Sequence, residues 1–169
     1  MQRSSFRTME CPVARSLEEV GEWWSILILR DAFYGLTRFD EFLKSLGVAP
    51  SILTRRLAGL VEHGLLEKQR YCERPPRDEY VLTDKGRDFQ PVLLALLAWG
   101  NRHLAGPEGV AVFATLRETG AVVDPAIVDR TTLAVLSPGN IRLVAGPGAG
   151  PEIRARLART ARGDRGAIP

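Results

Sequence analysis

The sequence predicts a mainly α-helical fold with a small β-wing, followed by a small strand-rich C-terminal extension. Apolar residues recur with helical spacing through most of the chain before residue 105, and the spacing becomes alternating, as in strands, between Leu66 and Leu82. From Gly106 onward, glycine and proline become frequent and the apolar runs shorten. We therefore expect a main domain over residues 1–105 and an accessory extension over residues 106–169.

Two helices are predicted at the start of the main domain. Pro12 opens the first, because a proline at the first helical position loses no hydrogen bond, and Gly21 ends it. The second runs from about Trp23 to Phe33 and is apolar on almost every side, which is typical of a helix at the centre of a core.

Two further helices are predicted on either side of a tight turn. Thr37, with Asp40 three residues later, has the form of a capping box at the start of the third helix. Gly47 makes the turn, Pro50 starts the fourth helix and Gly64 ends it. Two helices joined by a short glycine-containing turn form a helix-turn-helix.

A β-hairpin follows. Leu66–Cys72 and Glu79–Leu82 are expected to be its strands, and the segment between them, Glu73–Asp78, is expected to form a stiff, basic tip that contains prolines. The change from helical to alternating spacing is the basis of this prediction.

One long helix closes the main domain in this prediction. Thr83 caps it, it reaches about His103, and Pro91 is a candidate kink within it. The extension is expected to hold short strands and a closing helix, Pro151–Arg162.

Positive charge is concentrated in one part of the chain. The segment Ala49–Arg77 holds six Lys or Arg residues and three Glu, and this excess of +3 equals the net charge of the whole 169-residue chain. A local basic stretch is what binding to nucleic acid phosphates requires.

Several function classes are not expected. No apolar run approaches the ~20 residues of a membrane span, and the first residues show no secretory signal, so we expect a cytoplasmic protein. Cys11 and Cys72 make no disulfide framework, and His63 and His103 are isolated. We predict no metal site, no cofactor and no enzymatic activity.

The order of four helices, a hairpin and a long helix is that of a winged helix-turn-helix. A series of motifs between Cys11 and Leu104 is more specific. These motifs are Cys11-Pro12-Val13, Gly21–Trp24, Leu27–Asp31, Arg38–Phe42, Gly47–Leu57, Gly64–Leu66, Pro75–Arg77, Tyr80, Leu82–Gly86 and Trp99-Gly100. In them the chain resembles the HxlR family of bacterial regulators, a branch close to the MarR group. One departure is Glu22-Trp23, where the family more often has Asp and a basic or polar residue.

The fourth helix is predicted to read double-stranded DNA. Ser51, Thr54 and Arg55 fall opposite its apolar side, near the N-terminal end that enters a major groove. Pro50 lies at that end too, and Arg56, on the flank, is a candidate for a phosphate contact or a structural role. The alternative is an ordinary solvated helix face.

The wing is the second predicted DNA contact. Arg74 and Arg77 bracket its tip and could enter a minor groove or bind its phosphates; the alternative is a solvated turn. Arg38, within one of the family motifs, completes the predicted DNA-binding residues.

The resemblance implies dimerisation through the first and last helices, and hence a palindromic operator. The sequence agrees, because the last helix carries more apolar surface than a domain of this size easily covers; the alternative is that this stripe packs within its own domain. The predicted interface residues are Val13, Leu17, Val92, Leu93, Leu96, Leu97 and Trp99.

Cys11 is a candidate redox sensor. It stands at a predicted helix N-cap, where the helix dipole lowers a thiol pKa, and some members of the family sense oxidants through a cysteine at the matching position. The alternative is a purely structural cysteine.

Related tails with cysteine pairs suggest a zinc ribbon in some family members. Here Thr119 and Thr132 stand in such places and no cysteine follows Cys72, which excludes a thiolate zinc site. We expect a metal-free ribbon that supports dimerisation or binds an effector.

The sequence therefore predicts a dimeric, sequence-specific DNA-binding transcriptional regulator that responds to a small-molecule or redox signal. The alternative is a winged-helix interaction module without DNA binding. Modules of that kind precede a large catalytic domain, and only 63 residues follow Gly106.

Overall fold

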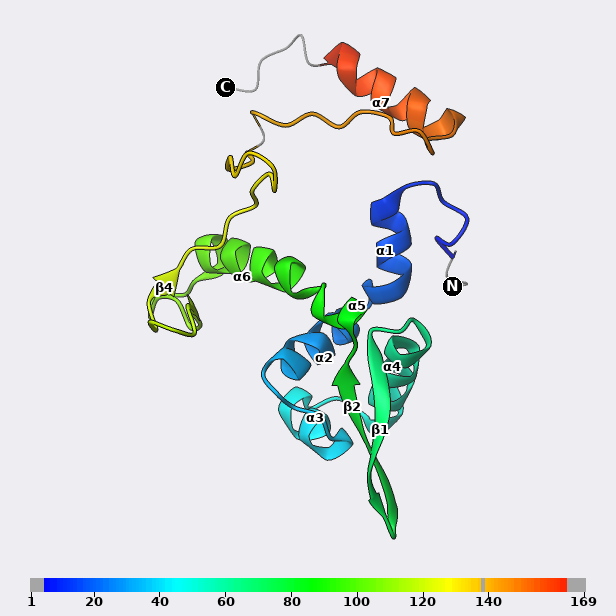
Figure 1. Cartoon of the computed structure of the whole chain (residues 1–169), viewed down its shortest axis with the longest axis vertical. Helices are drawn as coiled ribbons and strands as arrows, with labels where there is room; N and C mark the ends of the chain where they lie inside the picture. Colours follow the sequence, from blue (N-terminus) through cyan, green and yellow to red (C-terminus); the bar gives the residue numbers. More distant parts are fainter. Residues whose placement is uncertain (1–4, 138, 164–169) are drawn as a thin grey trace. The chain divides into compact units, whose positions relative to one another are not determined.

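The computed structural model describes residues 5–137 and 139–163 (Figure 1). The chain divides into two units, one formed by the residues up to Gly21 together with those from Ser137 onward, and the other by Glu22–Leu136. The predicted boundary after Ala105 falls inside the second unit, and the division into a main domain of residues 1–105 and an extension of residues 106–169 stays a prediction.

The core of the larger unit is built around α2 (Trp23–Phe33). This helix contacts α3 (Phe39–Leu46), α4 (Pro50–Glu62) and one strand of the hairpin. The prediction of a central apolar helix is confirmed, since Ile28 and Leu29 have no exposed surface. The other buried apolar side chains of this core are those of Phe42, Val48, Leu53, Leu57, Leu60, Leu65 and Leu66.

The start of α3 differs from the prediction. The helix begins at Phe39 with Arg38 as its N-cap, and not at Thr37. The capping carboxylate is that of Glu41, and not of Asp40: Glu41 Oε2 accepts the backbone N–H groups of Thr37, at 3.0 Å, and of Arg38, at 2.9 Å. The reason is positional, because a capping box uses the third residue after the N-cap.

The hairpin pairs β1 (Leu66–Glu73) with β2 (Pro76–Leu82) in antiparallel fashion. Both strands extend further than predicted, so the expected six-residue tip is wrong and only Arg74 and Pro75 lie between the strands. Pro76 is tolerated because it is the first residue of its strand. The hairpin projects away from the helices (Figure 1).

The single long closing helix is also wrong. The structure has a short α5 (Asp84–Arg87) and a separate α6 (Gln90–Leu104). Thr83 caps α5 as predicted, its Oγ1 accepting the Gly86 N–H at 3.0 Å. Pro91 sits in the first turn of α6, where its missing N–H costs nothing, whereas a continuous helix would press its ring against the carbonyl of Arg87.

The extension within the larger unit is lightly structured. Its regular strands are β3 (Ala114–Thr115) and β4 (Val122–Val123), paired antiparallel, and a bridge joins Val128 to Val135. Asn101 Nδ2 donates to the carbonyl of Val112 at 2.9 Å, which ties the extension to α6.

The smaller unit holds two helices, α1 (Pro12–Val20) and α7 (Pro151–Gly163), as the sequence predicts. The Glu18 carboxylate on α1 accepts the Ser5 hydroxyl and the Phe6 N–H, both at 2.8 Å. The apolar run at Ile141–Ala145 forms no strand. Among the described residues, no helix combines the length and apolar character that crossing a membrane would take.

Candidate nucleic-acid interface

α4 presents two different sides, as the predicted recognition helix should. Leu53, Leu57 and Leu60 are fully buried, and this fixes the rotation of the helix on the core. Ser51, Thr54 and Arg55 therefore emerge on the exposed side. The Thr54 hydroxyl donates to the carbonyl of Pro50 at 2.9 Å, which orients its oxygen lone pairs outward.

Arg56 behaves differently from its neighbour Arg55. Its guanidinium Nη2 lies 2.8 Å from Glu22 Oε2, and the two side chains are only 19% and 22% exposed. The pair links α4 to the N-cap of α2. The sequence left open a phosphate contact or a structural role for Arg56, and this ion pair favours the structural role.

The wing carries one neutralised and two unpaired arginines. Arg70 Nε lies 2.5 Å from Asp78 Oδ1 across the hairpin. Arg74 and Arg77 are exposed at the tip, and among the described residues no carboxylate pairs with either of them. The tip therefore presents two free positive charges.

Arg38 connects α3 to the wing. Its guanidinium carbon lies 4.7 Å from the ring centroid of Tyr71, within the range of a cation–π contact. Tyr71 is the extra residue at a register shift between Arg70 and Cys72. Nearby, the Tyr80 N–H on β2 donates to the carbonyl of Thr37 at 2.7 Å, so the base of the wing is held against the start of α3.

Sequence reasoning missed Glu22 and Tyr71. Both act on residues that are distant along the chain, and no local spacing marks such a pair. For Tyr71, the one signal in the sequence was its place as an aromatic residue within the basic stretch that predicts nucleic-acid binding.

The carboxylate of Glu41 supports this surface indirectly. The backbone N–H groups of Arg38 and Thr37 hold the pKa of Glu41 below its usual value, because they stabilise the charged form. A charged Glu41 in turn fixes the backbone that carries Arg38.

The predicted dimer residues are largely exposed in this chain. α6 has no fully buried residue, and Val92, Leu96 and Trp99 lie along one stripe of it with about half of their surface exposed. Leu93 and Leu97 are half-buried on a neighbouring side. On α1, Val13 is 68% and Leu17 47% exposed.

The two cysteines are both free thiols of intermediate exposure. Cys11 is the N-cap of α1, as predicted, and Pro12 follows in the first turn. Cys72 lies on β1. In the part of the chain that the structure describes, no three His, Cys, Asp or Glu side chains gather in a way that could hold a metal ion.

Comparison with known proteins agrees with this geometry. The model of the HxlR-like helix-turn-helix family matches residues 19–107. An uncharacterised HTH-type transcriptional regulator of Mycobacterium tuberculosis is 37% identical over 146 residues, which cover 86% of this chain and 90% of the relative.

Three solved structures are similar. PA1607, a proposed transcription factor, is 40% identical with a TM-score of 0.76 and covers 85% of this chain and all of its own. PA1374 of Pseudomonas aeruginosa, also a proposed transcription factor, is 51% identical with a TM-score of 0.62, over 86% of this chain and 99% of its own. The oxidised redox regulator HypR is 30% identical with a TM-score of 0.52, over 57% of this chain and all of its own.

The matches to the mycobacterial relative, PA1607 and PA1374 each cover 85% or 86% of this chain, which is more than residues 1–105 contain, so they include part of the extension. The match to HypR covers 57% of this chain, a share that the main domain alone can contain. The family match, the mycobacterial relative and the wing fold agree with one another. The chain is a member of the HxlR-like helix-turn-helix family of transcriptional regulators.

Proposed function

We propose that this regulator binds a specific double-stranded DNA sequence as a homodimer, with α4 in the major groove and the wing against an adjacent minor groove. One observation carries the proposal. Arg55, Arg74 and Arg77 are exposed and unpaired, while Arg56 and Arg70, their neighbours, are paired with carboxylates. A DNA-binding surface needs free cations where phosphates and base edges lie.

The exposed face of α4 supplies the chemistry of base recognition. A guanidinium donates two parallel hydrogen bonds to the O6 and N7 atoms of guanine, which suits Arg55. Ser51 and Thr54 are short hydroxyl side chains that hydrogen-bond to base edges or phosphates at close range. Pro50 begins the helix and has no N–H, and the Ile52 N–H donates to the carbonyl of Ala49 at 3.0 Å, so the Ser51 N–H is the first-turn donor that would face a phosphate.

Arg38 and the wing hold the protein on the DNA backbone in this proposal. α4 contacts β1, so the recognition helix and the wing form one continuous surface. Arg74 and Arg77 would enter the narrow minor groove or bind its phosphates, and Arg38 would bind a phosphate from its position beside Tyr71. Arg56 would position α4 through Glu22 rather than contact DNA.

Dimerisation would use the exposed stripe on α6. Val92, Leu96, Trp99 and His103 are spaced by four, three and four residues, the spacing of a seam between two paired helices. Val13 and Leu17 on α1 would extend the interface. A two-fold dimer presents two copies of α4, so the operator would be a palindrome with half-sites separated by about one helical turn or a multiple of it.

Fluorescence anisotropy tests the proposal. The protein is titrated into labelled DNA from just upstream of its own gene, and into random DNA, across a series of salt concentrations. Preferential binding to the upstream DNA, with a log affinity that falls linearly with log salt, is the expected result. Absence of binding to either DNA at low salt would contradict it and favour an interaction module.

A redox input is a second proposal, and Cys11 carries it. The thiol is half-buried at a helix N-cap, and HypR, to which the main domain is similar, is a redox regulator. Peroxide or quinone treatment is expected to change operator affinity in the wild type and to leave Cys11→Ser unaffected. An equal response in Cys11→Ser and the wild type rules the cysteine out; Cys72→Ser is the matched control.

A further inference from the structure

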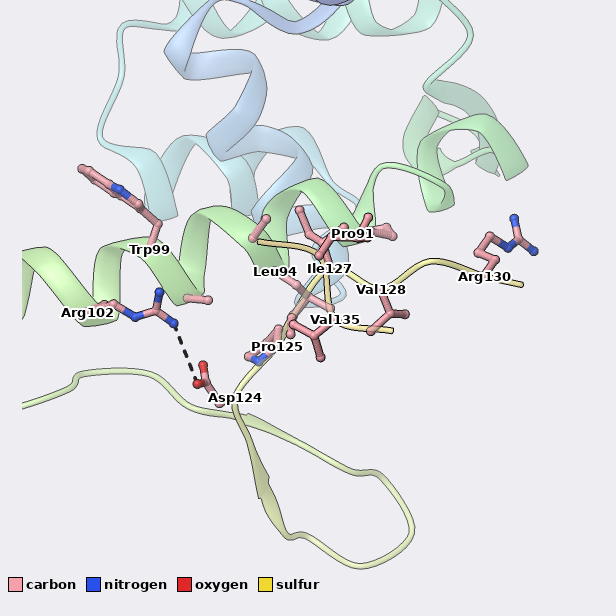
Figure 2. Close-up of a pocket in the computed structure, with 14 residues that line it drawn as sticks. Pro91, Leu94, Trp99, Arg102, Asp124, Pro125, Ile127, Val128, Arg130 and Val135 are labelled. Atoms are coloured by element: carbon pink, nitrogen blue, oxygen red, sulfur yellow. Dashed lines mark ion pairs between the residues drawn. The ribbon is translucent and has the colours of Figure 1, made fainter. Parts of the chain in front are cut away.

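The extension and α6 form an open cavity that the DNA-binding surface does not use. It lies within the larger unit, between one side of α6 and the segment 124–136 (Figure 2). Its volume is about 600 Å³, inside the roughly 300–1,000 Å³ typical of small-molecule sites.

Small residues on α6 create this space. Ala95 and Ala98 line the cavity from α6, together with the larger Leu94 and Trp99. Ile127, Val128 and Val135 form the facing wall. These three apolar side chains remain 63%, 41% and 58% exposed, so an apolar occupant would remove from water a surface that the chain itself leaves uncovered.

The facing wall is an ordered turn. Val128 bridges to Val135, and the Leu136 N–H donates to the carbonyl of Ile127 at 2.8 Å. At its end, the Asp129 carboxylate accepts the backbone N–H and the hydroxyl of Thr132, and these bonds lower the pKa of Asp129. The charged carboxylate of Asp129 therefore stabilises this turn through Thr132.

The charge around the cavity is positive. Arg102 and Arg130 line it, against the single carboxylate of Asp124. Arg102 Nη2 lies 3.9 Å from Asp124 Oδ2, and the two side chains are 64% and 82% exposed (Figure 2). So long and exposed an ion pair holds the guanidinium weakly. The group can therefore turn to a carboxylate ligand, which it binds through two parallel hydrogen bonds.

We propose that this cavity binds a hydrophobic carboxylate as an effector, with the apolar body against Ala95, Ala98 and Ile127 and the carboxylate on Arg102. The inference rests on the proposed function, since an effector acts here only if the protein is a DNA-binding regulator, and it adds a small-molecule input to that regulator. Trp99 provides the coupling. It lines the cavity, yet it projects away from the segment 124–136 and belongs to the exposed α6 stripe (Figure 2). An occupant that shifts Trp99 changes how two copies of α6 pair, and with it the distance between the two recognition helices.

Calorimetry with the full-length protein and two probes tests the site without DNA. Naphthalene-2-carboxylate is expected to bind at least tenfold more tightly than its neutral analogue naphthalene-2-methanol, because only the carboxylate accepts from Arg102. Arg102→Gln should remove this preference and leave the alcohol unchanged. Ala98→Phe should fill the cavity and abolish binding of both probes. Arg117→Gln, an exposed arginine of the extension outside the cavity, is the matched control and should change neither.

The outcomes separate the cavity from the DNA site. Absence of carboxylate binding, or equal binding by Arg102→Gln and the wild type, overturns the site even if the protein binds DNA. If a second copy of the chain occupies the cavity, neither probe should bind, and Ala98→Phe should self-associate more weakly than the wild type in sedimentation velocity. That result would also overturn the proposed effector site. In a protein that binds its operator, saturating carboxylate should change operator affinity, and an unchanged affinity overturns the effector role. Circular dichroism checks that Ala98→Phe folds, and Arg102→Gln decides the matter independently of it.

Discussion

At the scale of single residues, Arg55 and Arg56 are adjacent in the sequence but face different environments. Arg55 is exposed and unpaired, and Arg56 is paired with Glu22 at 2.8 Å. A rotation of about 100° around the helix axis, the angle between consecutive residues, thus separates an arginine available to DNA from an arginine that holds two helices together.

The pair makes a matched test. Arg55→Ala should weaken operator binding by about 1–3 kcal/mol and relax the preference for one base pair, with no change in stability. Arg56→Ala should instead lower the free energy of unfolding by about 2 kcal/mol, because Glu22 loses a charged partner in a mostly buried setting. Urea unfolding and anisotropy measure the two effects. Equal losses in both assays for both variants would contradict the assignment.

Glu41 gives a pH-dependent prediction at the same scale. Its folded pKa is depressed by the N–H groups of Arg38 and Thr37, so its stabilising contribution is present above the unfolded pKa of about 4.3 and is lost as the pH falls through the folded pKa. The wild type should therefore be more stable than Glu41→Gln near pH 7. The gap should narrow below about pH 4.5. Urea midpoints between pH 7 and pH 3 measure it, and a gap that widens with acid would be evidence against this cap.

At the scale of elements, the wing has a rigid base and a charged tip. The Tyr80–Thr37 hydrogen bond near the base and the Arg38–Tyr71 contact nearer the tip attach the wing to the start of α3, and the tip itself carries Arg74 and Arg77. This arrangement holds the two charges at a fixed distance from α4.

Substitutions at the tip should therefore act on the salt dependence. Arg74→Ala and Arg77→Ala should each lower the slope of log affinity against log salt by about 0.9 if each arginine neutralises one phosphate. The matched control is the double variant Arg70→Ala/Asp78→Ala, which removes the neighbouring ion pair without changing the net charge. An unchanged slope in both tip variants would show that the wing does not reach the DNA.

At the scale of the whole molecule, the exposed stripe of α6 points to a second copy of the chain. No residue of this apolar helix is fully buried within its own chain. Leu96→Asp should raise the dissociation constant of the dimer at least about a hundredfold, because the two-fold axis removes two buried leucines at once. Sedimentation equilibrium measures this. Tyr34→Asp, at the exposed aromatic C-cap residue of α2, is the control, and similar dimer stability in both variants would exclude the stripe as the interface.

The sequence by itself determined the order of the elements in the winged domain and the two sides of α4. These follow from local rules: helical spacing over Trp23–Phe33, alternation in the hairpin, glycine at Gly47 and proline at Pro12 and Pro50. The N-cap position of Cys11 could be predicted for the same reason, since a proline after it leaves little choice of where the helix begins.

Tertiary structure alone decided the features that depend on distant partners. The wing strands extend past their predicted ends, with Cys72 paired to Arg77 and Glu73 to Pro76 across the hairpin. Arg56 became structural because α2 brings Glu22 to it, and Arg38 lies over Tyr71 because the wing folds back on α3. The cavity formed because the segment 124–136 returns to α6. Local spacing constrains only residues within a turn or a strand, whereas these contacts depend on the path of the whole chain.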